Sequence, residues 1–570
     1  MLKRVILWNW VAVIVFLSAC QTAPSQTLNL FSPYPATRTP FQPVTEVNTL
    51  EEWGSQDSPT MPTPVVQTST ITPLSLTPIS PNTPFSLYIQ ADLQASILPV
   101  MQLPADLPLT TDPATASLSI FVGEDYPVSQ WIYALVAPFP TLVDGVSEQD
   151  LRAAWKGKSS GVFSGVPLLM SESTLGILSS YWGQPEEGAV SVHASEKLLS
   201  IAWEQKPSWA IIPFEQLNPQ WKVLSIRGNS PIHKDFDIDN YELAIPISMT
   251  GVAPELPKIP SSNRNPEKMT VLAMTGVTAL VRATAFTMEQ KGVTYPANDI
   301  GPTLLAADIT HISNEVPFAE NCPYPNPVQE DMRFCSRTKY IELLESIDTD
   351  IVELTGDHFA DWGADAMYYT LDLYDQRSWP YYGGGANIKE GRKPVMIEHH
   401  GNKLAFIGCN AKGGGYATAS ETSPGAVYCD WNWLEQTIAG LRAEGYLPIA
   451  TFQHFEYYTY AAQPDQIRDS ERMIKAGAVI VSGSQAHQPQ AFEFSQGGFI
   501  HHGLGNLFFD QLDVSEATRQ GFIDLHVFYD GRHISTELVT IYFIDYARAR
   551  LMNPQERTNL LQKVFSASGW

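Results

Sequence analysis

Short apolar runs alternate with helix-like segments over residues 269–545, and this alternation constrains the fold more than any other feature of the sequence. The clearest runs lie at residues 271–274, 403–408, 447–452 and 478–482. Polar or glycine residues follow each run, and α/β folds place their functional sites at such strand ends. Because strands that alternate with helices assemble into α/β domains, the sequence predicts an α/β domain over residues 268–545. Residues 546–570 are expected to form a C-terminal tail or helix.

A second globular segment precedes this domain, as a length of 570 residues requires more than one core. Residues 84–250 alternate strand and helix patterns, and Ser147 followed by Asp150 is a capping-box-like helix start. The run from Ser147 to Gly157 reads S-x-x-D-L-x-x-A-W-x-G and resembles solute-binding proteins of the phosphate- and molybdate-binding type. The resemblance implies a periplasmic-binding-protein-like α/β domain that either binds a small ligand or is a structural accessory. The proline-rich residues 251–267 are expected to link the two domains.

The start of the chain has the features of an export signal. Lys3 and Arg4 precede an apolar run that closes on Leu17-Ser18-Ala19-Cys20. A basic start, a short apolar core and small residues before a cleavage point are typical of a secretory signal. Cys20 also matches the bacterial lipobox, in which the thiol receives a diacylglyceryl group; the alternative is a plain N-terminal anchor helix with an incidental cysteine. We expect residues 1–20 to be a lipoprotein signal peptide and the remaining chain to be lipid-anchored on the extracytoplasmic face of the cell membrane.

Residues 21–83 are expected to be a disordered tether. Proline, serine and threonine recur throughout this segment, and no apolar period persists. Such a segment cannot bury enough surface to offset its chain entropy. Its expected role is to hold the folded part away from the membrane.

The charge of the chain excludes one class of partner. The 35 lysine and arginine residues face 60 aspartate and glutamate residues, for a net charge of −25. An acidic surface repels phosphate backbones, so a nucleic-acid partner is not expected. Binding of an anionic polymer would need a local basic cleft.

The cysteines other than Cys20 are four, namely Cys322, Cys335, Cys409 and Cys429. An even number in an exported chain favours disulfides over metal thiolates. Three pairings are possible, and pairing of nearest neighbours would close two loops rich in proline and glycine. The alternative is four free, buried thiols.

Motifs in a fixed order along the second domain resemble those of the CapA family, proteins associated with poly-γ-glutamate capsule synthesis. The motifs are Thr275–Arg282, Ala307–Pro317, Thr355–Gly363, Gln453–Tyr457, Gly483–His487 and Gly503–Asp510. They correspond to the family's TGD-x₄-R, ADL…NLE-x-P, NNH-x-x-D-x-G, HWG-x-E-Y, G-H-H-P-H and YSLGNF-x-F-D segments. The resemblance implies a metallophosphatase-like (calcineurin-like) α/β sandwich.

The resemblance also implies a set of site residues. The metal ligands would be Glu315, Asp357, His454 and His487, the acid/base pair His358 and Asp361, and the other site residues Arg282, Asn314, Glu456 and Asn506. The chain departs from the family at Val277, where the family has aspartate, and at Gln485, where it has histidine. An isopropyl group cannot bind a cation, so one Mn, Fe or Zn ion with nitrogen and oxygen ligands fits better than a two-metal cluster. The alternative is a hydrogen-bond network left from an enzymatic ancestor.

Three functions follow as hypotheses. The first is a membrane-anchored CapA-like protein in capsule or exopolymer synthesis or export, with capsule synthesis proteins or the anionic polymer as partners. The second is a metal-dependent hydrolase of phosphoester or amide bonds in envelope material. The third is a non-enzymatic solute-binding lipoprotein. Metal content separates the second hypothesis from the others.

Overall fold

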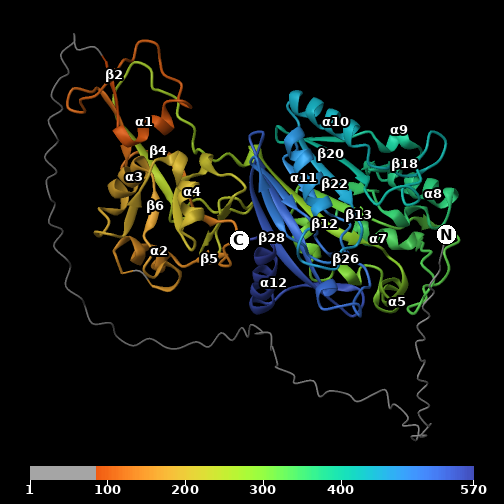
Figure 1. Ribbon diagram of the computed structural model, residues 1–570. Helices are drawn as coiled ribbons and strands as arrows, with labels where there is room; N and C mark the ends of the chain where they lie inside the picture. The colour runs from red at the N-terminus through yellow and green to blue at the C-terminus, as the bar shows by residue number, and fades with distance from the viewer. Residues whose placement is uncertain (1–84, 159) are drawn as a thin grey trace, which may run out of the picture. The chain divides into compact units, whose positions relative to one another are not determined.

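The computed structural model describes residues 85–158 and 160–570 (Figure 1). The signal peptide, the lipid attachment at Cys20 and the tether predicted for residues 1–83 lie outside the described residues. Mixed sheets and helices make up both predicted globular segments, so the α/β fold class predicted from the sequence is confirmed. In the described part of the chain, no helix combines the length and the apolar character that a membrane crossing requires.

The first segment is built on one sheet with the strand order β2-β1-β3-β11-β4-β8-β6-β7, in which β9 also pairs with β4. Its strands are β1 (Leu87–Ile89), β2 (Leu109–Thr110), β3 (Leu118–Val122), β4 (Pro127–Pro138), β6 (Leu168–Met170), β7 (Val190–Val192), β8 (Trp209–Pro213), β9 (Trp221–Val223) and β11 (Ala244–Gly251). Its helices are α1 (Ala91–Ile97), α2 (Glu148–Trp155), α3 (Glu172–Trp182) and α4 (Leu198–Glu204). The central strand β4 pairs antiparallel with β11, β8 and β9. The hydroxyl of Ser147 accepts a hydrogen bond from the backbone N–H of Asp150 at 3.0 Å, which confirms the N-cap predicted for α2.

Part of the stretch expected as a linker runs along β4. The side chain of Asn263 accepts a hydrogen bond from the N–H of Ile132 at 2.7 Å and donates one to its carbonyl at 3.0 Å. The hydroxyl of Ser129 donates to the carbonyl of Pro260 at 2.8 Å. The Asn263 bonds satisfy both backbone groups of Ile132, and the Ser129 bond satisfies the carbonyl of Pro260.

The second segment contains two sheets that enclose one apolar core. The larger sheet has the order β17-β16-β13-β12-β27-β28-β29, with β26 paired to β12, and the smaller has the order β19-β20-β22-β23-β25-β24. The larger sheet is formed by β12 (Met269–Thr278), β13 (Ile309–Asn314), β16 (Ile351–Glu353), β17 (Tyr381–Tyr382), β26 (Asn506–Phe508), β27 (Gln520–Tyr529), β28 (Arg532–Ile544) and β29 (Arg548–Leu551). The smaller is formed by β19 (Val395–His399), β20 (Asn402–Asn410), β22 (Leu447–Gln453), β23 (Ile480–Ser482), β24 (Phe492–Ser495) and β25 (Gly498–His501). Met274 of β12, Phe406 of β20 and Ile449 of β22 meet in the core between the sheets.

Helices cover the outer faces of both sheets, so the layers run helix, sheet, sheet, helix (Figure 1). They are α5 (Arg282–Lys291), α6 (Gly301–Leu305), α7 (Ile341–Glu345) and α8 (Ala364–Asp375) on the larger sheet, and α10 (Trp431–Ala443) and α11 (Pro464–Ala476) on the smaller. The short helix α9 (Ile388–Gly391) and the two-stranded pairs β5 (Gly145–Val146) with β10 (Ser225–Ile226), β14 (Phe318–Ala319) with β15 (Ser336–Arg337), and β18 (Gly384–Gly385) with β21 (Gly425–Ala426) complete the elements. In the predicted tail, α12 (Pro554–Ala567) adds Leu560, Leu561 and Val564 to the core between the sheets.

Buried titratable groups interrupt the apolar core of this segment. They are His311, His501, Asp524, His526 and His533. The Nδ1 atom of His501 lies 2.6 Å from Oδ2 of Asp524. Burial lowers the pKa of His311 and of His533 to about 3, and burial with nearby imidazoles lowers the pKa of His526 well below its ordinary value. These three imidazoles are therefore neutral at pH 7.

Two disulfides join nearest neighbours in the sequence, Cys322 with Cys335 and Cys409 with Cys429. Cys409 lies near the end of β20 and Cys429 precedes α10, and both side chains are buried among the residues that α10 and α11 pack against the sheet. The second bond therefore closes residues 410–428 into a loop at the carboxyl end of β20.

The second disulfide should contribute measurably to stability. Replacing Cys409 and Cys429 together by alanine is expected to lower the free energy of unfolding by about 3 kcal/mol, because a cross-link over a sequence separation of 20 residues restricts the unfolded chain by about that amount. The shift can be measured as the urea midpoint of the full chain. The parent protein under reducing conditions, in which both disulfides are open, should lose at least as much stability, and an unchanged midpoint in the double variant would contradict the expectation.

Candidate metal centre at the strand ends

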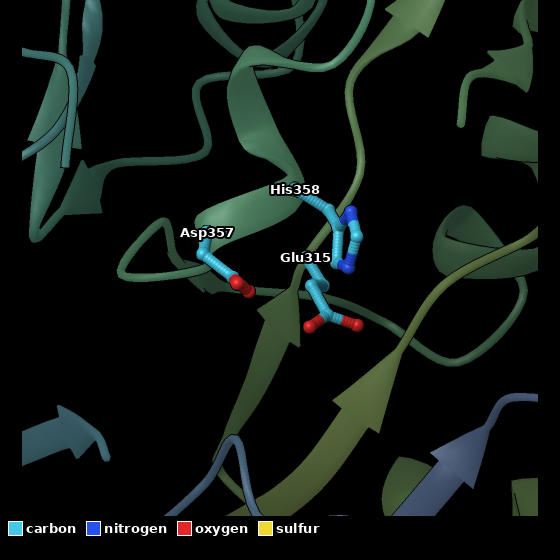
Figure 2. Close-up of side chains that lie close together, drawn as sticks. All are labelled: Glu315, Asp357 and His358. Carbon is cyan, nitrogen blue, oxygen red and sulfur yellow. The ribbon is translucent and has the colours of Figure 1, made fainter. Parts of the chain in front are cut away.

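Glu315, Asp357 and His358 converge at the carboxyl ends of two neighbouring strands (Figure 2). Glu315 directly follows β13, and Asp357 and His358 begin a short helical turn that follows β16. β13 and β16 pair in parallel, so both segments leave the sheet at the same edge. One ligand atom from each side chain lies within 4.8 Å of the others.

Close approach of the two segments depends on Gly356. A Cβ atom at this position would lie 2.8 Å from the Cα of Glu315 and 3.0 Å from its Cγ. Any side chain would therefore push the turn that carries Asp357 away from Glu315.

His358 is oriented by a carboxylate behind it. Its Nδ1 lies 2.7 Å from Oδ2 of Asp361, an oxygen that also accepts a hydrogen bond from the backbone N–H of Phe334 at 2.9 Å. This leaves Nε2 as the ligand nitrogen, the arrangement found for most metal-binding histidines. Burial alone would lower the pKa of His358, but Asp361, Glu315 and Asp357 outweigh it and raise the pKa to about 9.

Asp357 is held by an amide that also fixes the neighbouring strand end. Gln453, the last residue of β22, accepts a hydrogen bond from the backbone N–H of Asp357 at 2.6 Å and donates one to its Oδ1 at 2.7 Å. Asn410, the last residue of β20, donates to the carbonyl oxygen of the same Gln453 side chain at 2.7 Å. The turn is thereby joined to the smaller sheet.

Lys412 is part of this site and was not predicted from the sequence. Its Nζ lies 2.6 Å from Oδ2 of Asp357 and 2.7 Å from Oε1 of Glu456, and only 6% of its side chain is exposed. Burial opposes the charge, yet the two carboxylates outweigh it and raise the pKa of Lys412. Its position two residues after β20 could have indicated a site residue, because functional residues of α/β folds lie at strand ends.

The pKa shifts of Glu315 and Asp357 show that each carboxyl group interacts with several charged neighbours. Burial raises the pKa of Glu315, and the charges of His487 and His358 oppose that rise. Burial would also raise the pKa of Asp357, but His358 and Lys412 outweigh it, so this pKa lies below its ordinary value. Asp357 is therefore the more strongly ionised of the two carboxyls.

Asn506 orients the buried imidazole of His487. The amide nitrogen of Asn506 donates to the carbonyls of His487 and Thr518 at 3.1 and 3.2 Å, so the Asn506 side-chain oxygen must be the acceptor for Nδ1 of His487 at 2.9 Å. Nδ1 of His487 thus donates this hydrogen bond. His487 is not a member of the three-residue cluster, although its charge opposes the rise in the pKa of Glu315.

The other residues predicted from the sequence lie outside the cluster. His454 follows β22 and lies beside α11, 3.8 Å from Asp465 and 4.0 Å from Asp469. The amide of Asn314 donates to the hydroxyl of Tyr374 at 2.8 Å, away from the cluster. Arg282 donates from Nε to Asp510 at 2.9 Å.

The two positions that depart from the family supply no cation ligand. Val277 is buried in an apolar cluster with Val281, Val316 and Phe509. The amide of Gln485 donates to the hydroxyl of Ser313 at 2.6 Å.

Two carboxylates and an imidazole are a suitable donor set for a single Mn, Fe or Zn ion. Gln453, Asp361 and Gly356 hold the donors in place, so the residues present fit one such ion. The sequence predicts His454 as a ligand, but the imidazole in the observed cluster is that of His358.

Comparison with solved structures gives similarities over parts of the chain. A phosphate transport receptor from Vibrio cholerae is 10% identical, with 30% of this chain and 88% of that chain covered and a TM-score of 0.24. A 5'-nucleotidase precursor from Thermus thermophilus is 12% identical, covering 53% and 58% with a TM-score of 0.32. NAD nucleotidase from Haemophilus influenzae is 9% identical, covering 52% and 55% with a TM-score of 0.29. The similar region spans little more than half the length of these two nucleotidases.

Comparison of sequences gives one family. No curated protein sequence matches the chain. A match to one family model supports the resemblance to CapA proteins, and the matched stretch includes every residue of the centre. Residues 271–511 match the family model described as bacterial capsule synthesis protein PGA_cap.

Proposed function

We propose that this chain takes part in the synthesis or export of a capsule or exopolymer of the poly-γ-glutamate type. The observation that carries the proposal is that Glu315, Asp357 and His358 converge within the stretch that matches the PGA_cap family. In this proposal a lipid on Cys20 holds the chain at the extracytoplasmic face of the cell membrane. Its partners there are other capsule synthesis proteins or the anionic polymer itself.

The centre is proposed to hold one divalent cation on Glu315, Asp357 and Nε2 of His358. A cation bound there supplies Lewis acidity toward a carbonyl or phosphoryl oxygen. The residues of the chain position the donors: Gln453 fixes the carboxylate of Asp357, and Asp361 fixes the imidazole of His358.

A second candidate function is hydrolysis of a phosphoester or amide bond in envelope material. The observation that favours it is the orientation of His487, a buried imidazole whose Nδ1 is hydrogen-bonded to Asn506. An imidazole held in this form by Asn506 can take a proton from a water molecule. In this candidate the polymer is the substrate rather than the product.

Deleting the gene in the organism that encodes the chain tests the proposal. We expect the deletion to remove the cell-bound polymer, measured as glutamate released by acid hydrolysis of washed cells. A plasmid copy of the parent should restore the polymer, whereas a Glu315→Gln copy at the same protein level should restore none, because this substitution removes one charged donor. An unchanged polymer content in the deletion strain would refute the proposal. A normal amount of polymer with increased chain length would favour the hydrolase candidate instead.

A further inference from the structure

The ammonium group of Lys412 occupies a fixed place inside the metal centre. Two of its three N–H groups are directed to Asp357 and Glu456, and its Nζ lies 4.7 Å from the centroid of the Tyr416 ring. Contact with an aromatic face stabilises a cation. Two of the three N–H groups thus donate to carboxylates, and the positive charge also lies against an aromatic ring.

The chain around Lys412 keeps the ammonium in this place. Its backbone N–H donates to the side-chain oxygen of Asn410 at 3.0 Å, and the Asn410 amide in turn donates to the carbonyl of Thr355 at 2.9 Å. Asn410 follows Cys409, whose disulfide to Cys429 closes the loop that carries the lysine. The backbone of Lys412 is therefore held by Asn410, which is in turn hydrogen-bonded to the segment that follows β16.

The carboxyl groups of the centre outnumber the two positive charges of a single divalent cation. Glu315 and Asp357 belong to the cluster, Glu456 is joined to Asp357 through Lys412, and Asp361 holds His358. Val277 and Gln485, where the family carries ligands, are engaged elsewhere and offer nothing to a second ion. A compact ammonium is a point charge that can offset one of the remaining carboxylates.

We propose that the Lys412 ammonium takes the place of a second metal ion, so that the centre holds one divalent cation and one fixed protein cation. The inference rests on the metal centre proposed above. It adds the number of metal ions that the centre binds and names Lys412 as the group that limits this number. Lys412 in this role is a positioning and charge-compensating residue. Its removal leaves Asp357 and Glu456 without their counter-ion and frees them for a metal.

Titration of the full chain with Mn²⁺ in detergent tests this inference. Bound metal is measured by calorimetry and by elemental analysis after gel filtration. The variants are Lys412→Met, which removes the charge, Lys412→Arg, which keeps it, and Lys475→Met, which removes an exposed charge on α11. Melting temperatures of all variants report on folding, and Lys412→Gln replaces Lys412→Met if the latter does not fold.

We expect the parent, Lys412→Arg and Lys475→Met to bind one Mn²⁺ with similar affinity. Lys412→Met should bind Mn²⁺ at least about tenfold more tightly, or take a second equivalent, because it removes a positive charge next to the ligands. A Lys412→Met variant that binds one Mn²⁺ with the same or lower affinity would overturn the inference and leave the metal centre standing.

A parent protein that binds no Mn²⁺ bears on both the proposed metal centre and the role inferred for Lys412. If the parent binds no Mn²⁺ and Lys412→Met binds it, the ammonium excludes the cation altogether, which overturns both the metal centre of the parent and the one-cation stoichiometry inferred here. If neither binds Mn²⁺, both proposals fail.

Discussion

Replacing His358 by alanine is expected to weaken Mn²⁺ binding by the full chain at least about hundredfold. The substitution removes one of three donors, whereas loss of a group that merely orients a ligand already costs about 10- to 100-fold. Asp361→Asn, which leaves the imidazole in place but weakens its orientation, should give this smaller loss. Both effects can be measured by calorimetric titration with Mn²⁺.

His454→Ala is the matched control for this prediction. The sequence motif predicts His454 as a ligand, whereas the structure places it beside Asp465 and Asp469 and outside the cluster. We therefore expect His454→Ala to bind Mn²⁺ as the parent does. Loss of binding in His454→Ala together with retention in His358→Ala would show that the motif, and not the observed cluster, identifies the ligand.

Acidification is expected to destabilise the second segment strongly. His311 and His533 have pKa values near 3 when folded and near 6.5 in the unfolded chain, because burial excludes the charged form. The unfolded chain therefore binds more protons below pH 6.5, so this stability is fully present above pH 6.5 and is lost as the pH falls toward 3. Below pH 6.5 the slope for each histidine approaches about 1.4 kcal/mol per pH unit, which gives roughly 3 kcal/mol for both between pH 6.5 and pH 5.

Substitution of each histidine isolates its contribution. His311→Gln and His533→Gln should each reduce the difference between urea midpoints at pH 7 and pH 5, and the half-buried His193→Gln should leave it unchanged. The comparison is made between variants because buried carboxyls such as Glu353, whose pKa burial raises, act in the opposite sense at lower pH. Identical pH dependence in parent and variants would contradict the assignment of neutral imidazoles to the core.

Much of the fold follows from local pattern. The runs predicted at residues 271–274, 403–408 and 447–452 lie within β12, β20 and β22, and the run at 478–482 contains β23. Apolar runs between helices have few alternatives to a buried parallel sheet. The convergence of Glu315 with Asp357 follows from the same logic, because both come after parallel neighbouring strands.

The site was less predictable because neighbouring residues at a strand end point in different directions. Successive side chains along a strand alternate between its two faces. Gln453 reaches the centre while His454, the next residue, lies beside α11. Lys412 enters the centre through a loop whose path is set by contacts with Asn410 and by a disulfide, and neither contact appears in a linear pattern.

The disulfide between Cys409 and Cys429 also determines when the loop that carries Lys412 is closed. Thiols stay reduced in the cytoplasm and pair in oxidising compartments, so a newly made chain holds Lys412 on a loop that is not yet closed at Cys409. After the bond forms, the ammonium has far less freedom to leave Asp357. For an exported chain, as proposed above, we therefore expect Lys412 to be fixed beside Asp357 only outside the cytoplasm, when oxidation of this cysteine pair closes the loop.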